Sequence, residues 1–265
     1  MNKAQTLTIS SLVDKETNSL SIIADAAQRI FKSGFVWSKV RINIRGGRTI
    51  LFKKNYRNTN EIAIAANSLL DKELDKEEFT EIEYSGRKGE KPKIACCSDY
   101  EEQVNLLNNH LIILKNTNSL NSTVILHRST NGVIKIKNYL DANGFSAELV
   151  KSNQPVNYES DSVKVCTMSS VKGLDFNNVI ILDLNDDIIP YPPGFIDEDD
   201  EYHISAERRL LYTCMTRARN KLFLFTSERS NASRYLKEID AALLDDITPN
   251  NWFSQPYFGE CSFPF

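Results

Sequence analysis

The 265-residue sequence lacks the features of several common protein classes. Its five cysteines form no C-x-x-C pair and its three histidines are scattered, so neither a zinc site nor a disulfide framework is indicated. No apolar run approaches the ~20 residues that a membrane span needs, and the N-terminus shows no signal-peptide pattern. We therefore expect a cytoplasmic protein with reduced thiols, no resident metal and no membrane association.

A phosphate-binding loop is also missing. No G-x-x-x-x-G-K-[ST] motif occurs, and Gly86-Arg87-Lys88-Gly89 does not have its spacing. The chain therefore has no backbone cradle of this kind for the phosphates of a nucleotide. Ser-His-Asp spacing, metal-ligand clusters and cofactor fingerprints are absent as well, which argues against an unrelated class of enzyme.

The sequence does have an ordinary composition with unevenly distributed charge. Hydrophobic residues make up 41% and charged residues 25%, typical of a soluble globular protein with one large or two small domains. The net charge is −3, but nine basic and no acidic residues lie between Arg29 and Arg57. Between Asp183 and Glu201 there are eight acidic and no basic residues. Because this acidic segment also contains three prolines and a glycine, we expect an exposed, solvated loop.

The basic segment is interleaved with aromatic residues, namely Phe31, Phe35, Trp37 and Tyr56. A groove for single-stranded nucleic acid uses this combination, because cations follow the phosphates while rings stack on the bases. The alternative is that the rings belong to a core and the charges form a solvated face. The segment by itself leaves both interpretations open.

Short apolar runs alternate with helical patterns along the chain. The runs are rich in Val and Ile, and we expect buried strands at 20–23, 93–97, 123–126, 163–168, 178–184 and 221–225. Helices are expected from the capping boxes Asn58–Glu61 and Ser98–Glu101, and from about Gly132 to the terminator Asn143-Gly144. This alternation predicts an α/β domain with a mostly parallel sheet.

One further helical pattern, ERRLLYTCMTRAR at 207–219, contains four arginines. Its apolar residues share one arc of a helical wheel, and Ser205 is the expected N-cap. On that wheel Arg209 points away from the arc, whereas Arg208 and Arg217 lie at its edges. Arginines on a solvated helix commonly extend their charged ends into water, but a guanidinium at the edge of a cleft is also suited to phosphate.

Four stretches together resemble the UvrD/Rep-like superfamily 1 DNA helicases, in the order found in that family, from about residue 2 to about residue 228. They are LSIIADAAQRIF (20–31), ILFKKNYRNT (50–59), VCTMSSVKGLDF (165–176) and the arginine-rich helical pattern. Each places a polar group at the expected carboxyl end of a strand or start of a helix, where α/β sheets bind ligands.

The resemblance implies roles for individual residues. It implies that Gln28 lies near the γ-phosphate and the attacking water, that Arg57 contacts phosphate, and that Arg217 is an arginine finger, so these three are the candidate catalytic residues. Gly173 and Asp175 are expected to face the nucleotide. Contacts to single-stranded DNA are expected from Phe31, Trp37, Arg41, Arg45, Thr167, Ser169 and Ser170.

The sequence departs from the family pattern at several positions. Asn2 and Lys3 stand where the second motif has its magnesium-binding acid and its catalytic glutamate, and neither can perform those functions. Ser169 replaces a usual histidine, Asp175 a glutamate, and Ser33 a frequent base-stacking tryptophan. The short spacing between Val150 and Val163 also leaves out an accessory domain that relatives often have.

We therefore expect a RecA-like fold of the P-loop NTPase type, with a remnant of a first such domain at 1–45, a second at 46–235 and a tail at 236–265. The expected function is that of a truncated, ATP-dependent superfamily 1 DNA helicase or translocase that hydrolyses little ATP by itself. ATP and Mg²⁺ would bind only with a complementing first domain, which a protein partner could supply. The alternative is a non-catalytic module that binds nucleic acid or a partner protein.

Overall fold

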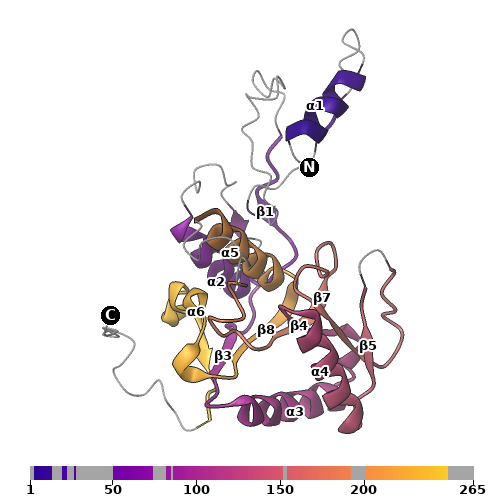
Figure 1. Ribbon diagram of the computed structural model, residues 1–265, viewed down its shortest axis with the longest axis vertical. Coiled ribbons are helices and arrows are strands. Elements are labelled where there is room, and N and C mark those ends of the chain that lie inside the picture. Colours follow the sequence, from indigo (N-terminus) through magenta and orange to yellow (C-terminus); the bar gives the residue numbers. More distant parts are fainter. Residues whose placement is uncertain are drawn as a thin grey trace.

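The computed structural model describes residues 3–13, 20–22, 27, 50–73, 82–84, 86–151, 154–191 and 201–249. Its centre is a seven-stranded sheet in which every pair of neighbouring strands is parallel (Figure 1). In spatial order the strands are β5 (Ala147–Leu149), β6 (Val163–Thr167), β4 (Thr123–His127), β7 (Phe176–Ile181), β8 (Ala218–Thr226), β3 (Lys93–Cys96) and β9 (Asp245–Asp246). The sheet extends past residue 235, the expected end of the second domain, because β9 pairs with β3.

The strands are buried on both faces because helices cover both sides of the sheet. Alternate residues of a strand point to opposite faces, so Val124 and Leu126 of β4 join one apolar cluster while Ile125 joins the other. The first cluster includes residues of α2 (Asn60–Leu69), α5 (Glu201–Met215) and α6 (Arg234–Glu238). The second includes residues of α3 (Tyr100–Asn116) and α4 (Thr130–Ala142). The parallel α/β fold expected from the sequence is therefore confirmed.

Helix starts differ from the expected capping positions by one residue. Thr59, not Asn58, caps α2, and Glu61 accepts a hydrogen bond from the Gly89 N–H instead of closing a capping box. Asp99, not Ser98, caps α3 through the Glu102 N–H. Asn58 instead donates to the distant carbonyls of Thr216 and Ala218, and the Ser98 hydroxyl donates to the Glu102 carboxylate.

The bounds of α4 agree with the expectation from the sequence, whereas those of α5 do not. α4 begins after Ser129, and Gly144 follows its end with φ +76°, the conformation expected of a glycine terminator. Ser205 does not cap the arginine-rich helix, because α5 already includes it and its hydroxyl donates to Glu73. α5 ends at Met215, so Arg217 lies beyond the helix.

Four smaller features complete the described fold. β1 (Lys54–Asn55) and β2 (Glu83–Tyr84) form a separate two-stranded parallel sheet, and α1 (Lys3–Leu12) lies apart from the main sheet (Figure 1). The described residues 20–22 form neither strand nor helix, so the strand expected at 20–23 is not observed there. Single-turn 3-10 helices occur at Leu70–Lys72, Leu120–Ser122, Arg229–Asn231 and Ala241–Leu243.

The described part of the chain shows the length of its helices and the state of its cysteines. None of its helices is long and apolar enough to cross a membrane. Its cysteines, Cys96, Cys97, Cys166 and Cys214, are free and buried, and burial raises the pKa of Cys96 to about 11. Thiols with such raised pKa values are poor nucleophiles, which fits a structural role in the core.

Candidate functional site

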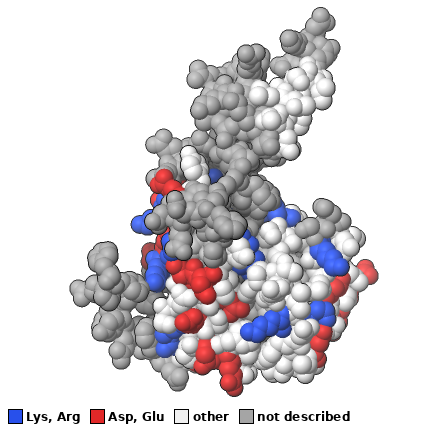
Figure 2. Space-filling view, in the orientation of Figure 1, with Lys and Arg blue, Asp and Glu red and all other residues white. Residues whose placement is uncertain are grey.

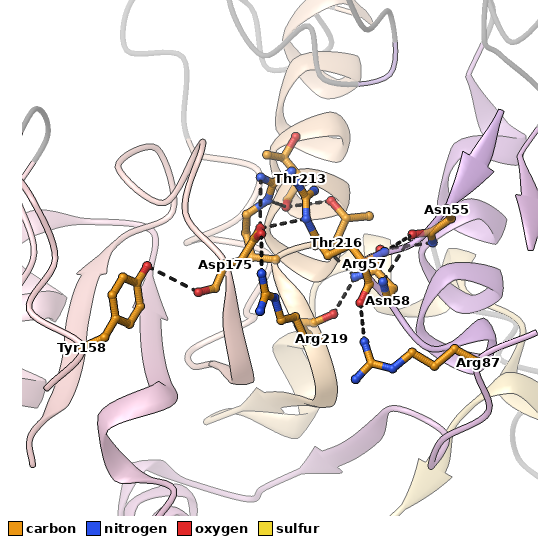
Figure 3. Close-up of polar contacts among 11 residues, drawn as sticks. Asn55, Arg57, Asn58, Arg87, Tyr158, Asp175, Thr213, Thr216 and Arg219 are labelled. Carbon is orange, nitrogen blue, oxygen red and sulfur yellow. Dashed lines mark hydrogen bonds and ion pairs between the residues drawn. The ribbon is translucent and has the colours of Figure 1, made fainter. Parts of the chain in front are cut away.

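Three arginines converge on one carboxylate at the edge of the main sheet (Figure 3). Arg57 Nε lies 2.8 Å from Asp175 Oδ1, and Arg219 Nη2 lies 3.4 Å from Asp175 Oδ2. Arg217 Nη1 lies 4.0 Å from Asp175 Oδ1. Two residues assigned from different motifs, Arg57 and Arg217, thus face the same anionic group.

This cluster lies at the amino-terminal edge of the sheet. Asp175 immediately precedes β7 and Arg217 immediately precedes β8, two strands that are parallel neighbours. From the sequence, each motif is expected to place its polar group at the carboxyl end of a strand or at the start of a helix, and Asp175 and Arg217 lie at neither. The segment between β6 and β7 runs from one edge of the sheet back to the other, which local sequence patterns do not reveal.

Arg57 is held by hydrogen bonds to its own backbone. The Asn55 side chain accepts from the Arg57 and Asn58 N–H groups at 3.0 and 3.2 Å, an Asx-type turn that carries the chain from β1 towards α2. Arg87 Nη1 donates to the Arg57 carbonyl at 2.8 Å. With its backbone fixed in this way, the half-exposed guanidinium reaches Asp175.

Arg217 is the most deeply buried of the three arginines, with 3% of its side chain exposed. Its Nε donates to the Thr213 carbonyl at 3.1 Å, one turn back in α5. Burial and the nearby positive charge of Arg57 lower the pKa of Arg217, although Asp175 acts in the opposite direction. A guanidinium that is poorly solvated and close to another cation has a strong electrostatic preference for an anion at this place.

Asp175 reaches the arginines at the end of a turn that requires a glycine. Gly173 has φ +89°, a backbone conformation that other residues rarely adopt, and it sits two residues before Asp175. Asp175 Oδ1 has its ion-pair contacts but no hydrogen-bond donor among the described residues, because the 2.8 Å approach of Arg57 Nε lacks hydrogen-bond geometry. This buried oxygen is therefore only partly compensated by its neighbours.

The other two arginines of the segment have a structural role. Arg208 contacts Glu73 and Glu238, both at 2.6 Å, and Arg209 Nη2 lies 2.7 Å from Glu73. Although Arg209 points away from the apolar arc of the helical wheel, it is only 5% exposed. Glu73 follows the 3-10 helix after α2, so an acid distant in sequence fixed the position of this arginine.

A second polar cluster lies at the carboxyl end of β6, where Thr167 Oγ1 is 3.1 Å from Ser169 Oγ and 2.8 Å from Ser170 Oγ. Hydroxyls in such a turn can donate to phosphate oxygens of a nucleic-acid backbone. The expected DNA contacts of the fifth motif thus gather in one place, at the opposite edge of the sheet from Asp175.

Several expected site residues fall outside the described part of the chain, namely Gln28, Phe31, Trp37, Arg41 and Arg45. Conversely, Arg219 lies at the site although no motif indicated it, and Asn58, expected to cap a helix, contacts the backbone on either side of Arg217. Arg219 follows Arg217 by two residues, and in an extended chain such residues share a face, whereas the sequence pattern predicts a helix here. The local pattern indicates Asn58 only as a helix cap, because its partners Thr216 and Ala218 are 158 and 160 residues away.

The arrangement has the chemistry of an anion site. The described residues contain no group of three or more His, Cys, Asp or Glu side chains that could hold a metal ion. On the face seen in Figure 2, basic and acidic side chains lie among one another over the described residues. The arginine cluster is thus a local concentration of positive charge around a single acid.

Comparisons with known proteins agree with this architecture. The chain is 37% identical over 97 residues to the ATP-dependent DNA helicase PcrA of Staphylococcus epidermidis strain RP62A, covering 33% of this chain and 13% of that protein. It is 36% identical over 95 residues to the PcrA of Staphylococcus aureus strain Mu50, covering 32% of this chain and again 13% of that protein. These matches therefore span a small part of the relatives' length.

A solved structure and a family profile cover more of the chain. The crystal structure of the C-terminal domain of a possible DNA helicase from Lactobacillus plantarum WCFS1 superposes with a TM-score of 0.54 at 22% identity, covering 72% of this chain and 98% of that one, which supports the fold. Residues 50–155 and 147–229 match the profile of the UvrD-like helicase C-terminal domain. The chain therefore belongs to the family of UvrD-like helicase C-terminal domains.

Proposed function

We propose that this chain is the carboxyl-terminal part of an ATP-dependent superfamily 1 DNA helicase or translocase, supplying Arg57 and Arg217 to a nucleotide held by a first RecA-like domain. The observation that carries the proposal is the convergence of Arg57, Arg217 and Arg219 on Asp175. A guanidinium is planar, permanently charged and rich in donors, so it pairs with phosphate oxygens as it does with a carboxylate. In this structure Asp175 provides the anionic oxygens that phosphate would provide.

For catalysis the site requires a complete first RecA-like domain in addition to this chain. The chain has no phosphate-binding loop, and Asn2 and Lys3 replace the acids of the second motif. ATP and Mg²⁺ would be held by the first domain, with the metal neutralising charge on the phosphates. Arg217 would then stabilise the charge that develops on the γ-phosphate, and Arg57 would orient the phosphates.

Movement along DNA would come from closing the two domains around ATP. Single-stranded DNA would contact Thr167, Ser169 and Ser170 at the opposite edge of the sheet, together with the basic segment at 29–57. Binding and hydrolysis alternately close and open such domain pairs. The sheet would thus link an anion site at one edge to a strand-binding surface at the other.

An ATPase assay tests this proposal on the 265-residue chain and on the chain joined to a PcrA-type first domain, each with and without single-stranded DNA. We expect negligible turnover by the chain alone and DNA-stimulated turnover by the joined protein. Arg217→Ala should lower the latter by about 10³-fold or more, the usual effect of an arginine finger. Arg234→Ala, which removes an exposed arginine paired with Asp186, is the matched control and should retain activity.

Two outcomes would reject the proposal. One is rapid hydrolysis by the unjoined chain, which would mean that it contains a complete site. The other is an undiminished rate in the joined Arg217→Ala protein.

The alternative is a module that binds nucleic acid or a partner protein without hydrolysis. The hydroxyl cluster at Thr167 favours this alternative, because these hydroxyls could contact nucleic acid without a bound nucleotide. Strand binding by a joined protein that never hydrolyses ATP would support this alternative.

A further inference from the structure

We propose that Asn58 is the positioning residue that holds Arg57 and Arg217 in register with each other. The inference rests on the proposed function, because it concerns the same two arginines. Asn58 is 4% exposed and lies between Arg57 and the start of α2. Its Nδ2 donates to the Thr216 carbonyl at 3.0 Å and to the Ala218 carbonyl at 2.5 Å, the residues on either side of Arg217 (Figure 3).

These two hydrogen bonds join the start of α2 to the segment between α5 and β8, which is distant in the sequence. Thr216 is the first residue after α5, and Ala218 begins β8. Because Asn58 bridges the two carbonyls, it fixes the backbone from which the Arg217 side chain leaves. Asn58 directly follows Arg57, so the same residue ties the backbones of both arginines together.

The chemistry of the side chain explains why an asparagine is suited to this position. A primary amide carries two N–H donors on one nitrogen, and here both are used by backbone carbonyls. The amide oxygen accepts from Asn55 Nδ2 at 3.2 Å, and Asn55 in turn holds the Arg57 N–H. A serine has one donor and an aspartate has none, so neither can bridge both carbonyls.

The bridge has a consequence for the site. Burial lowers the pKa of Arg217, and Arg57 is close enough for like-charge repulsion to lower it further. Asp175 offsets part of this repulsion, and the hydrogen bonds of Asn58 fix the backbones that carry the two cations. Asn58 therefore preorganises the pair for a polyphosphate, which saves the cost of ordering them on binding.

The experiment uses the full 265-residue chain, labelled with ¹⁵N and titrated with inorganic tripolyphosphate at low salt. The Nε–Hε signals of Arg57 and Arg217, assigned with Arg57→Lys and Arg217→Lys variants, report binding. We expect both signals of the native chain to shift with one dissociation constant. Asn58→Ser should raise that constant about 5- to 10-fold, the effect of losing one hydrogen bond of typical strength.

The control is Asn185→Ser. Asn185 is 5% exposed and donates to Ser227 at the carboxyl edge of the sheet, so its loss removes a similar buried amide away from the arginines. We expect it to lower stability to urea as Asn58→Ser does, while changing tripolyphosphate affinity less than about 2-fold. Combining Asn58→Ser with Arg217→Lys should weaken binding little more than Arg217→Lys alone, because Asn58 acts through that arginine.

The outcomes separate the inference from the proposed function. If the native chain binds tripolyphosphate and Asn58→Ser binds it equally well, the positioning role is wrong and the anion site stands. Equal weakening by Asn185→Ser, or full additivity with Arg217→Lys, would also overturn that role. If tripolyphosphate shifts neither arginine signal in the native chain, the anion site fails and the inference fails with it.

Discussion

Asp175 has to satisfy two requirements that conflict. It neutralises charge among Arg57, Arg217 and Arg219, yet under the proposed function it also occupies the place at which a phosphate would bind. One of its oxygens is buried without a hydrogen-bond donor among the described residues, so the pairing is incomplete. An anion with more oxygens can satisfy the arginines better than this single carboxylate does.

Replacing Asp175 by asparagine should therefore strengthen binding of tripolyphosphate to the chain. The substitution keeps the size of the side chain and removes the competing charge, and we expect an affinity about 3- to 10-fold higher at low salt, falling as salt is added. Isothermal titration or the arginine signals would measure it. Glu90→Gln, which removes an acid paired with Lys93 and Lys221, is the control and should have little effect. Unchanged or weaker binding in Asp175→Asn would contradict this prediction.

Helices and strands are joined by buried ionic contacts at places where the apolar core ends. Glu73 connects the segment after α2 to Arg208 and Arg209 of α5. Removing one partner of such a buried ion pair lowers the free energy of unfolding by about 3–5 kcal/mol. A second junction lies at the carboxyl edge of the sheet. There Asp183, which follows β7, pairs with His127 of β4 at 3.2 Å and with Gln103 of α3 at 2.8 Å.

Because Asp183 lies at the second junction, we expect the stability of the fold to depend on pH. Burial alone would raise the pKa of Asp183, but hydrogen bonds from His127, Ser227 and Gln103 outweigh it and lower the pKa. A carboxyl whose pKa is lower in the folded state contributes stability above its unfolded pKa of about 4, and this contribution disappears as the pH falls through the folded value. Asp183→Asn should therefore lower the free energy of unfolding by about 1–3 kcal/mol near pH 7, with a smaller difference near pH 3.

Urea unfolding followed by circular dichroism at several pH values would measure this difference. Asp141→Asn, which removes an exposed acid paired with Lys137 on α4, should change stability by less than about 0.5 kcal/mol. A gap between the native chain and Asp183→Asn that stayed constant from pH 7 to pH 3 would show that the charge of Asp183 is not the cause.

At the scale of the whole molecule, the sheet separates two kinds of polar site. The arginine cluster lies at the amino edge, beside β7 and β8, whereas the hydroxyl cluster lies at the carboxyl end of β6. The net charge of −3 is no obstacle to nucleic-acid binding, since nine basic residues lie in one acid-free segment from Arg29 to Arg57. Binding should therefore depend on that segment and on salt.

We expect weak binding of the chain to oligo(dT), with affinity that falls as salt is added. Changing Arg41 and Arg45 to glutamate should weaken it and reduce the slope of log affinity against log salt by about 1–2. Fluorescence anisotropy at several salt concentrations would measure both quantities. Lys115→Glu with Lys151→Glu makes the same change of net charge elsewhere and should have a smaller effect. Equal effects of the two pairs would indicate non-specific attraction.

The local pattern of apolar and polar residues was sufficient to predict most of the strands and helices. Five of the six expected strands are present, because runs such as TVIL at 123–126 are buried on both faces and must be apolar throughout. It was also sufficient for the three long helices that begin after Thr59, Asp99 and Ser129, apart from the exact capping residue. The strand expected at 20–23 is the exception, since the described residues there form no strand.

The sequence by itself determined which chemical groups the chain carries and which family motifs they resemble, because these depend only on residue types and their local order. Tertiary structure decided which of them meet. Arg209, which points away from the apolar arc of its helix, is buried against Glu73, and Arg219, which no motif indicated, joins Arg57 and Arg217 at Asp175. The physical reason is that such contacts depend on the order of strands in the sheet. Placing β7 beside β8, with α2 packed on the same face, brings together residues that no local pattern relates.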